Sequence, residues 1–430
     1  MTPSRKVYIV VLDGAGDRPN VQLDGQTPLL YARTPHLDAL AARSRMARVH
    51  VIGPGFWPES DSGAMAILSY DPLTHYTGRG PLEGLGAGMI ASDGSAVAFR
   101  ANFGSYDADR QRLDRRTARG LSDSELQQLA GELRDQLSLQ DLGPFEFSIT
   151  AFARHRAIIG IRSNGPRLDG RVTNTDPGFR NVGVFGVPVD YHEGRPLESR
   201  AIDPQNAGAR RAAQLVNSVA ERASEILSLS SVNRSRAERG VMPANVLLIR
   251  DGGIAPQPLP SFASLHGRSL HLFGQIFAEK GLASLVDGSF DFSVQREDEV
   301  PSAYLSRAVA AFLAADEDVV FIHLKGPDEP GHDNLPFDKV RAIEDIDASF
   351  IGPLCAEADD EATIIVCCDH ATPCGLGIHS DDPVPVMVVR PDWRPDGIGR
   401  FSEQDSARGS VPVERMCDLL AEALSERHAL

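Results

Sequence analysis

Short runs of apolar, mostly β-branched residues recur along the chain between longer segments with helical periodicity. The clearest runs are residues 7–12, 319–322, which His323 follows in the same predicted strand, and 364–366. Runs of this length that are apolar throughout predict strands buried on both faces of a parallel sheet. The first run ends at Asp13 and the third is soon followed by Asp369, so we expect both carboxylates at the carboxyl edge of that sheet, where open α/β folds place their chemistry.

Apolar residues at helical spacing separate the predicted strands. Thr34, followed by a proline, is a helix N-cap pattern, and further helices are expected at 215–226, 273–282, 340–350 and 416–424. Strands that alternate with helices in this way predict an α/β core, a mostly parallel sheet flanked by helices.

Residues 114–176 differ in pattern from the rest, and we predict that they form a smaller inserted α+β domain. A capping box opens a leucine-rich helix at 122–137, and strands are expected at 145–150 and 156–161. The core then consists of residues 1–113 and 177–430.

Composition and charge restrict the class of protein. The chain has 430 residues, of which 42% are hydrophobic and 24% charged, as in ordinary globular proteins. Its net charge of −16 argues against a general binder of nucleic acids or anionic membranes. An anionic substrate would therefore need a local cluster of arginines or metal cations.

The cysteines and the N-terminus indicate a cytoplasmic enzyme. The five cysteines are odd in number and lack C-x-x-C spacing, which favours reduced thiols; Cys374, the one nearest the candidate ligands, is expected to be a packing residue. The first apolar run has only six residues, too few for a signal peptide or a membrane span, and no later segment qualifies.

Residues able to bind metals occur at or near the predicted strand ends. Each has a simple structural explanation by itself, because aspartates form turns and serines cap helices. Pro330 and Gly331 further predict a tight loop, rather than a helix, between two of these residues. The full set comprises Asp13, Ser60, Asp328, His332, Asp369, His370 and His379.

Together these seven residues indicate a two-metal centre. Two cations about 3.5–4 Å apart lower the pKa of a bound hydroxyl and neutralise the oxygens of a transferring phosphoryl group. Ser60 lies at the start of an expected helix, where amide dipoles stabilise negative charge. The arrangement suits phosphoryl or sulfuryl transfer through a covalent seryl intermediate.

Basic residues provide candidates for binding an anion. The glycine-rich segment 76–87 has neither a P-loop nor a dinucleotide fingerprint, so we expect a loop in which Arg79 is a candidate functional residue. Arg250 ends a predicted strand at 245–250. The predicted insertion adds Arg115, Arg116, His155 and Arg156.

Several motifs in a fixed order resemble one known family. They are Val-Leu-Asp-Gly-Ala-Gly-Asp-Arg-Pro (11–19), Thr-Pro-x-Leu-Asp (34–38), Glu-Ser-Asp-Ser-Gly (59–63), Tyr-Thr-Gly-Arg-Gly-Pro-Leu-Glu (76–83), Pro-Ala-Asn-Val (243–246), Asp-Glu-Pro-Gly-His-Asp (328–333), Asp-His-Ala-Thr-Pro-Cys (369–374) and His-Ser-Asp-Asp-Pro-Val-Pro-Val (379–386). The chain thus resembles the cofactor-independent phosphoglycerate mutases of the archaeal type, in the alkaline phosphatase superfamily. The motifs around Asp328 and Asp369 are the most specific.

The resemblance implies an alkaline-phosphatase-like core, a cap domain that closes over the cleft to exclude water, and an isomerase of glycolysis that needs no 2,3-bisphosphoglycerate. It implies two divalent cations, Mn or Mg or alternatively Zn. One would be bound by Asp13, Ser60, Asp369 and His370, and the other by Asp328, His332 and His379. Ser60 would be the nucleophile. The implied candidates for binding a small phosphorylated substrate are Asn102, Arg115, His155, Arg156 and Arg250.

The chain departs from the family pattern near the substrate. Relatives usually have Gly-Ser-Asp-Thr-Ala-Asn at the nucleophile, whereas here Glu59 precedes the serine and Gly63-Ala64 replace Ala-Asn. Asp251 stands where a small residue follows the arginine in relatives. All of the expected ligands are retained.

Three hypotheses remain open at this point. The first is a phosphoglycerate mutase that interconverts 3- and 2-phosphoglycerate. The second is a metal-dependent phosphomutase, phosphotransferase or phosphatase that acts on another phosphate or phosphonate ester in a specialised pathway. The third, a non-catalytic binding or scaffold protein, fits poorly with a complete ligand set. The sequence leaves the oligomeric state open.

Overall fold

The computed structural model divides into two compact units, which are described separately. The first consists of Met1–Tyr76, Leu259–Glu279 and Ala283–Leu430, and the second of Thr77–Pro258 and Lys280–Leu282. The structure describes residues 5–90, 93–115, 120–152, 155–189, 194–254 and 256–425.

A mostly parallel sheet forms the centre of the first unit. Within the described residues it has seven strands in the order β11-β10-β12-β1-β13-β14-β2, and only β14 runs against its neighbours. The strands are β1 (Val7–Leu12), β2 (Arg45–Val49), β10 (Leu270–Gly274), β11 (Ser289–Phe292), β12 (Val319–Leu324), β13 (Thr363–Cys367) and β14 (Val384–Val389).

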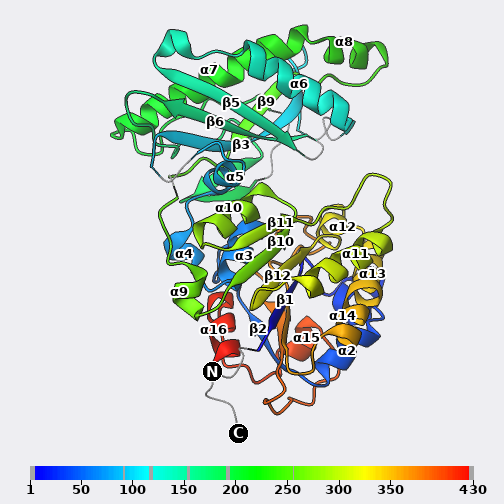
Figure 1. Ribbon diagram of the computed structural model, residues 1–430. Helices are drawn as coiled ribbons and strands as arrows, with labels where there is room; N and C mark the ends of the chain where they lie inside the picture. Colours follow the sequence, from blue (N-terminus) through cyan, green and yellow to red (C-terminus); the bar gives the residue numbers. More distant parts are fainter. Residues whose placement is uncertain are drawn as a thin grey trace. The chain divides into compact units, whose positions relative to one another are not determined.

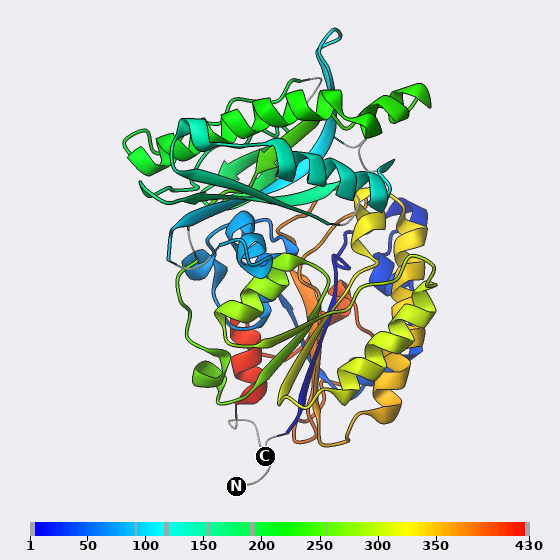
Figure 2. The ribbon, with the colours of Figure 1, turned by 45° about the horizontal axis from the view of Figure 1, so that its top comes forward.

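The three central strands are those that the apolar runs predicted. All residues of β1, β12 and β13 are buried, because helices cover both faces of the sheet. In Figure 2 the strands lie between the yellow and orange helices on one side and the red and green helices on the other. The prediction of an α/β core with a mostly parallel sheet is therefore confirmed.

Short helices connect the strands of the first unit. The α-helices are α1 (Pro28–Tyr31), α2 (Pro35–Ala41), α3 (Ser60–Ile67), α4 (Pro72–His75), α9 (Phe262–His266), α10 (Phe277–Leu285), α11 (Pro301–Ala314), α12 (Asp328–His332), α13 (Pro336–Ile346), α14 (Gly352–Glu357), α15 (Glu403–Ser406) and α16 (Leu419–Leu424). The 3₁₀ and π turns are η1 (Val21–Leu23), η4 (Asp347–Ile351) and η5 (Met416–Asp418).

Three local predictions were wrong. The glycine-rich segment 76–87, expected to be a loop, contains the helix α5 (Arg79–Gly86), which packs against strands of the second unit. The expected helix at 273–282 begins only at Phe277, because the preceding segment pairs with β12 as strand β10, and the pattern of five residues does not reveal that pairing. The segment Asp328–His332 is one turn of helix, α12, rather than a loop. Pro330 is tolerated there because the first turn of a helix does not use its backbone N–H groups.

The second unit contains an antiparallel sheet in the order β4-β3-β6-β5, with β9 also paired to β3. Helices α6 and α7 cover one face of this sheet, and α5 packs against β3 and β6 (Figure 1). Its elements are α5 (Arg79–Gly86), β3 (Ala96–Asp107), β4 (Arg112–Asp114), α6 (Asp123–Gln136), η3 (Gln140–Leu142), β5 (Phe145–Phe152), β6 (Arg156–Ser163), β7 (Phe179–Val182), β8 (Phe185–Pro188), α7 (Ala207–Leu229), α8 (Ser231–Glu238) and β9 (Val246–Arg250).

The second unit is larger than the insertion predicted at 114–176. It begins at Thr77 and continues to Pro258, because β3 before the predicted insertion and β9 after it belong to the same sheet as β5 and β6. Strand pairing across so long a stretch of chain is not visible in local periodicity.

Candidate functional site

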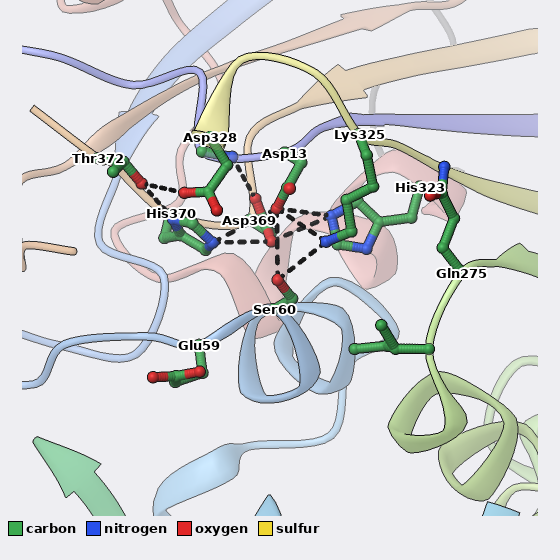
Figure 3. A network of polar contacts seen from close by, with 12 residues as sticks. Asp13, Glu59, Ser60, Gln275, His323, Lys325, Asp328, Asp369, His370 and Thr372 are labelled. Atoms are coloured by element: carbon green, nitrogen blue, oxygen red, sulfur yellow. Dashed lines mark hydrogen bonds and ion pairs between the residues drawn. The ribbon is translucent and has the colours of Figure 1, made fainter. Parts of the chain in front are cut away.

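The polar residues that follow three neighbouring strands meet at one edge of the parallel sheet. Strands β12, β1 and β13 are adjacent and parallel, so their carboxyl ends lie together. Asp13 follows β1, Lys325 follows β12, and Asp369 and His370 come just after β13. Figure 3 shows these side chains pointing toward one another. The placement predicted for the two carboxylates is confirmed.

Ser60 completes this group from the first position of α3. Its hydroxyl donates to Asp13 Oδ1 over 3.3 Å and accepts from the Lys325 ammonium over 3.1 Å (Figure 3). Helix α3 approaches the strand end so closely that a Cβ on Gly63 would lie 2.6 Å from the carbonyl oxygen of Asp369. The glycine that departs from the family pattern is therefore required by this packing. The Glu59 side chain points away from the serine hydroxyl.

Asp13, Asp369 and His370 form the first group of candidate metal ligands, and all three are buried. His370 Nε2 lies 3.5 Å from Asp13 Oδ1 and 3.3 Å from Asp369 Oδ2. The backbone N–H of Gly14 donates to the other oxygen of Asp369 over 2.9 Å, which leaves Oδ2 directed at the group. Gly14 adopts a φ of +58°, and a Cβ there would lie 2.6 Å from Asp328 Oδ1, so a glycine is needed.

Asp328, His332 and His379 form the second group. The Nε2 atoms of the two histidines are 3.2 Å apart, and each is 3.5 Å from Asp328 Oδ1. The single turn of α12 brings Asp328 and His332 onto one face, because they are four residues apart. His370 also lies within reach of Asp328 and His379, so the two groups adjoin.

The histidines of both groups share one orientation. His332 Nδ1 lies 2.9 Å from the carbonyl oxygen of Gly377, and His379 Nδ1 lies 2.8 Å from that of Pro58. Carbonyl oxygens only accept, so each Nδ1 carries a proton, and each Nε2 is the nitrogen directed at Asp328 and available to a cation. Metal-binding histidines are usually oriented in this way.

His370 is oriented through a hydroxyl group rather than a carbonyl. Its Nδ1 is 3.0 Å from Thr372 Oγ1, whose hydroxyl donates to Asp328 Oδ1 over 2.7 Å. Because that hydroxyl proton is directed at Asp328, the Thr372 oxygen accepts a hydrogen bond from Nδ1 of His370. Nε2 of His370 is therefore again the nitrogen available to a cation. The same chain of hydrogen bonds links the two groups of ligands.

The donor atoms fit divalent cations. Ligands bound at about 2.0–2.2 Å in tetrahedral or octahedral geometry lie about 2.9–3.6 Å apart, the range in which these atoms lie. Among the described residues, no hydrogen bond reaches His370 Nε2 or Asp369 Oδ2, although both atoms are buried. Carboxylate and imidazole donors suit Mn or Zn, and Mg where oxygen predominates.

The charges of the site also favour bound cations. Burial raises the pKa of Asp13, but Lys325, His323 and His370 outweigh burial, so this pKa lies well below its ordinary value. Burial lowers the pKa of His379, yet the adjacent Asp328 carboxylate outweighs it and raises the pKa to about 9. Asp13 and Asp328, whose pKa values are both lowered, are thus ionised at neutral pH, and a cation would displace a proton from His379.

Two residues of this site were missed in the sequence. Lys325 lies 3.0 Å from Asp13 Oδ1, and His323 Nε2 lies 3.1 Å from Asp369 Oδ2 (Figure 3). His323 interrupts an apolar strand and Lys325 comes directly after it, and either fact could have drawn attention to them.

A second polar cluster lies on one face of the antiparallel sheet, in the second unit. Arg100 pairs with Arg250 on the neighbouring strand, and Asn102 pairs with Arg156, so alternation places all four on the same face. Arg100, Asn102 and Arg250 are buried. Among the described residues, no hydrogen bond reaches Nε of Arg100 or of Arg250. We call these four residues the guanidinium cluster.

One carboxylate beside the cluster is shared by two arginines. Glu83, on α5, accepts from Arg79 over 3.1 Å and from Arg100 over 2.9 Å. Burial lowers the pKa of Arg100 to about 9, and the nearby charges of Arg79, Arg250 and Arg156 act in the same direction. An excess of buried positive charge is what an anion-binding site provides.

The remaining candidates lie around the cluster. Arg250 is ion-paired with Asp251 and stacks on the ring of Phe179 at 3.9 Å, and Arg115 lies 5.0 Å from the same ring. Arg115 is also ion-paired with Asp176. His155 is buried and directly precedes β6. Arg116 lies outside the described residues. Arg100 was missed, although it is two residues before Asn102 and so shares its face of a strand.

Two further observations concern the expectations from composition. All five cysteines are free, and burial raises the pKa of Cys374 to about 12, as expected of a packing thiol rather than a ligand. None of the helices in the described part of the chain combines the length and apolar content needed to cross a bilayer.

Comparison with known proteins gives a consistent result. A sequence model of the family described as 2,3-bisphosphoglycerate-independent phosphoglycerate mutase matches residues 41–233. Proteins with that name from Aeropyrum pernix and Methanoculleus marisnigri are each 36% identical to this chain, over 94% and 97% of its length and 95% and 96% of theirs.

Solved structures agree with these relatives. A protein of Pyrococcus horikoshii matches with a TM-score of 0.76 and 26% identity over 99% of both chains. The cofactor-independent phosphoglycerate mutase from Thermoplasma acidophilum matches with a TM-score of 0.60 and 29% identity, over 97% of this chain and 98% of that chain. Both matches extend over the two units.

Proposed function

Because the chain belongs to the 2,3-bisphosphoglycerate-independent phosphoglycerate mutase family, we propose that it interconverts 3-phosphoglycerate and 2-phosphoglycerate at Ser60. The resemblance inferred from the motifs is confirmed by the relatives, and membership implies that no 2,3-bisphosphoglycerate is required. The phosphoserine intermediate, the two cations and the roles of individual residues are our proposals.

The position of the Ser60 hydroxyl is the observation that supports this function most. The hydroxyl lies at a helix N-terminus between Asp13 and Lys325, beside two groups of donors that fit cations. Backbone N–H groups at a helix N-terminus stabilise an anion placed there. A serine that carries a phosphoryl group would gain from each of these features.

We assign one cation to Asp13, Ser60, Asp369 and His370, and the other to Asp328, His332 and His379. Bound divalent cations would supply charge neutralisation for the phosphoryl oxygens and would lower the pKa of a hydroxyl group. Lys325 binds a phosphoryl oxygen in this proposal, since its ammonium group already contacts the Ser60 oxygen.

The transfer proceeds in two balanced steps. Ser60 Oγ attacks phosphorus, the bond from phosphorus to the O3 atom of the substrate breaks, and the proton lost by the serine ends on O3. The O2 atom of the glycerate then attacks the phosphoserine, its proton returns to Ser60 Oγ, and 2-phosphoglycerate forms. Water must stay away from the phosphoserine between the steps, because hydrolysis would yield inorganic phosphate instead.

The guanidinium cluster is our proposed binding site for the anionic groups of the substrate. Guanidinium groups bind carboxylates and phosphates through paired hydrogen bonds, and Arg100 and Arg250 have donors that no described residue uses. Asn102, Arg156, His155 and Arg115 lie at or beside this cluster and are included in the proposal. We assign the substrate-capping role to the second unit for this reason.

One observation favours a second candidate function. The Asp251 carboxylate is paired with the Arg250 guanidinium group, where an anion of the substrate would otherwise bind. The resemblance described above led us to expect a small residue at this position. A substrate with one anionic group fewer, or a differently shaped one, would suit such a site. The alternative is therefore a metal-dependent phosphomutase or phosphatase acting on another phosphate or phosphonate ester.

The cellular setting follows from the first proposal. A phosphoglycerate mutase works in glycolysis, and we place this enzyme in the cytoplasm with Mn as its preferred cation. Imidazole nitrogens among the donors favour Mn over Mg.

A single phosphorus NMR experiment tests the function. The protein is incubated with Mn²⁺ and 3-phosphoglycerate without 2,3-bisphosphoglycerate, and the cation is removed with EDTA before the spectrum is recorded, because Mn²⁺ broadens the signals. We expect a 2-phosphoglycerate signal that is absent when EDTA is added first.

The other outcomes have defined meanings. If inorganic phosphate is the main product, the enzyme is a phosphatase rather than a mutase. An unchanged spectrum, with 3-phosphoglycerate intact, would contradict the first function and leave the alternative substrate to be found among other phosphate and phosphonate esters.

A further inference from the structure

His323 is a fully buried histidine whose position the proposed two-metal site does not yet explain. It lies next to the last residue of β12, and its Nε2 is 3.1 Å from Asp369 Oδ2 and 3.3 Å from Asp13 Oδ1. These separations are similar to those of His370, which lies 3.3 Å and 3.5 Å from the same two oxygens. The two imidazoles therefore approach one pair of carboxylate oxygens in the same way.

The other nitrogen of His323 is fixed by a carboxylate. Nδ1 is hydrogen-bonded to Glu279, which is fully buried. The second oxygen of Glu279 accepts from the backbone N–H groups of Gln275 over 2.7 Å and Ile276 over 3.0 Å. This carboxylate is thus fixed in place, and it binds the Nδ1 proton of the imidazole.

His323 shares its orientation with the three histidines already assigned as ligands. In each of the four, Nδ1 contacts an oxygen acceptor and Nε2 faces the carboxylates. Among the described residues, no hydrogen bond reaches His323 Nε2, His370 Nε2 or Asp369 Oδ2, although all three atoms are buried and close together. Buried polar atoms that have no hydrogen-bond partner are rare and call for an explanation, and a cation between them provides one.

We propose that His323 is a fifth protein ligand of the cation bound by Asp13, Ser60, Asp369 and His370, with Glu279 as its positioning residue. This inference rests on the proposed two-metal function. Carboxylates that bind the far nitrogen of a metal-bound histidine orient the ring and strengthen it as a ligand.

The extra ligand has a consequence for metal choice. With His323 the cation has two imidazole nitrogens among its donors, and nitrogen donors favour Mn, Co and Zn over Mg, which prefers oxygen. The site without His323 has one nitrogen. His323 therefore makes this cation site select against Mg²⁺.

The competing explanation is a structural imidazolium. A His323 protonated on both nitrogens would pair with Asp13, Asp369 and Glu279 and would need no cation. The two explanations differ in whether the Nε2 atom bonds to the metal, which spectroscopy and metal affinity report without any measurement of turnover.

The experiment compares the whole protein with His323→Asn and with His271→Asn as a matched control. His271 is a buried histidine of β10 whose Nδ1 lies 3.3 Å from Glu317 Oε1, and it belongs to neither group of ligands. Titration calorimetry with Mn²⁺ and with Mg²⁺ gives the number of sites and their affinities. We expect His323→Asn to weaken one of two Mn²⁺ sites by about 10–100-fold, with little change in Mg²⁺ affinity and none in the control.

Electron-nuclear resonance of the Mn²⁺-loaded native protein labelled with ¹⁵N-histidine keeps the inference testable if the variant fails to fold. We expect couplings from two nitrogens at the cation bound by Asp13, and a single coupling would overturn the inference. Unchanged Mn²⁺ affinities in a folded His323→Asn variant would overturn it as well. If the native protein bound no Mn²⁺, the two-metal function itself would fail, an outcome distinct from both.

Discussion

The two polar clusters of this chain are opposite in charge and differ in construction. The cluster around Asp13 gathers carboxylates and imidazoles at the carboxyl ends of adjacent parallel strands, and its donors suit cations. The guanidinium cluster, opposite in charge, lies on one face of an antiparallel sheet and suits anions. In each cluster, some buried polar atoms have no hydrogen-bond partner among the described residues.

The difference shows how an acidic protein can use an anionic substrate. A net charge of −16 repels a phosphorylated molecule at long range, so attraction must come from local groups. Under the proposed function, bound cations would reverse the charge of the first cluster, whereas arginines supply the positive charge of the second. The first cluster therefore depends on metal and pH, and the second depends on the geometry of its arginines.

The largest expected effect is that of removing the proposed nucleophile, which should slow the chemical step without weakening substrate binding. Ser60→Ala removes the nucleophile, and we expect turnover to fall by at least about 10³-fold while the KM changes little. Steady-state rates and a test for acid-stable phosphoserine in the quenched enzyme check this.

Ser62→Ala is the matched control, because Ser62 lies two residues further on the same helix. Among the described residues, its hydroxyl bonds to the backbone of Glu59 alone. This substitution should leave the rate intact and cost about 1 kcal/mol of stability through the lost helix cap. Normal turnover in the Ser60→Ala enzyme would show that Ser60 is not the nucleophile. It would also contradict the separate roles of the two clusters, chemistry in the first and substrate binding in the second.

The second effect addresses the guanidinium cluster. Arg100→Met preserves bulk but removes the charge, and we expect KM for phosphoglycerate to rise by about 10–100-fold, the value of one or two charged hydrogen bonds. Affinity for Mn²⁺ should stay the same. Arg110→Met, an exposed arginine in the same unit, is the control. Loss of Mn²⁺ binding in Arg100→Met would contradict the separation of the two clusters.

The third effect is the pH dependence of metal binding. In the metal-free protein the pKa of His379 is about 9, raised by Asp328, so this histidine is protonated at pH 7. A cation must displace that proton, so Mn²⁺ affinity should rise about tenfold per pH unit up to pH 9. Calorimetry in buffers of different ionisation enthalpy counts the released protons. A flat affinity between pH 7 and 8.5 would mean that His379 is not a ligand.

The smallest effect concerns Asp251, the residue that departs from the family pattern. Asp251→Asn keeps a side chain that tolerates the φ of +55° at this position but removes the charge paired with Arg250. If phosphoglycerate is the true substrate, KM should fall by about 3–10-fold, the value of one hydrogen bond that the buried Arg250 could then donate to the substrate.

Asp107→Asn, which breaks a surface pair with Arg110, provides the control for Asp251. A rise in KM for phosphoglycerate in Asp251→Asn would show that Asp251 itself helps to bind the substrate, and would favour the alternative function.

The cluster around Asp13 could largely be predicted from the sequence, and the guanidinium cluster only in part. Asp13 and Asp369 follow apolar runs, and an apolar run that ends in a carboxylate indicates a strand end wherever the strand lies in the sheet. Arg100 was missed, because its neighbours on the sheet face come from β6 and β9, which are far away in the chain. Pairing between distant strands has no local sequence signal.

The same limit explains why the bounds of the second unit and the position of His323 were not predicted. Local patterns predicted β5, β6 and α6 but not the extension of the unit from Thr77 to Pro258, since β3 and β9 join it only through their pairing. His323 was hidden within a strand, where its approach to Asp13 and Asp369 depends on the order of β12, β1 and β13.

The sequence by itself determined the parallel core, the seven candidate ligands, of which Ser60 is one, and the family. These features depend on residue type and short spacing. Tertiary structure alone decided which histidines face which carboxylates, that Gly63 is required beside Asp369, and that Arg100 and Arg250 lie on one face. The physical reason is distance along the chain, because contacts between residues hundreds of positions apart arise from strand order and packing, which local periodicity does not encode.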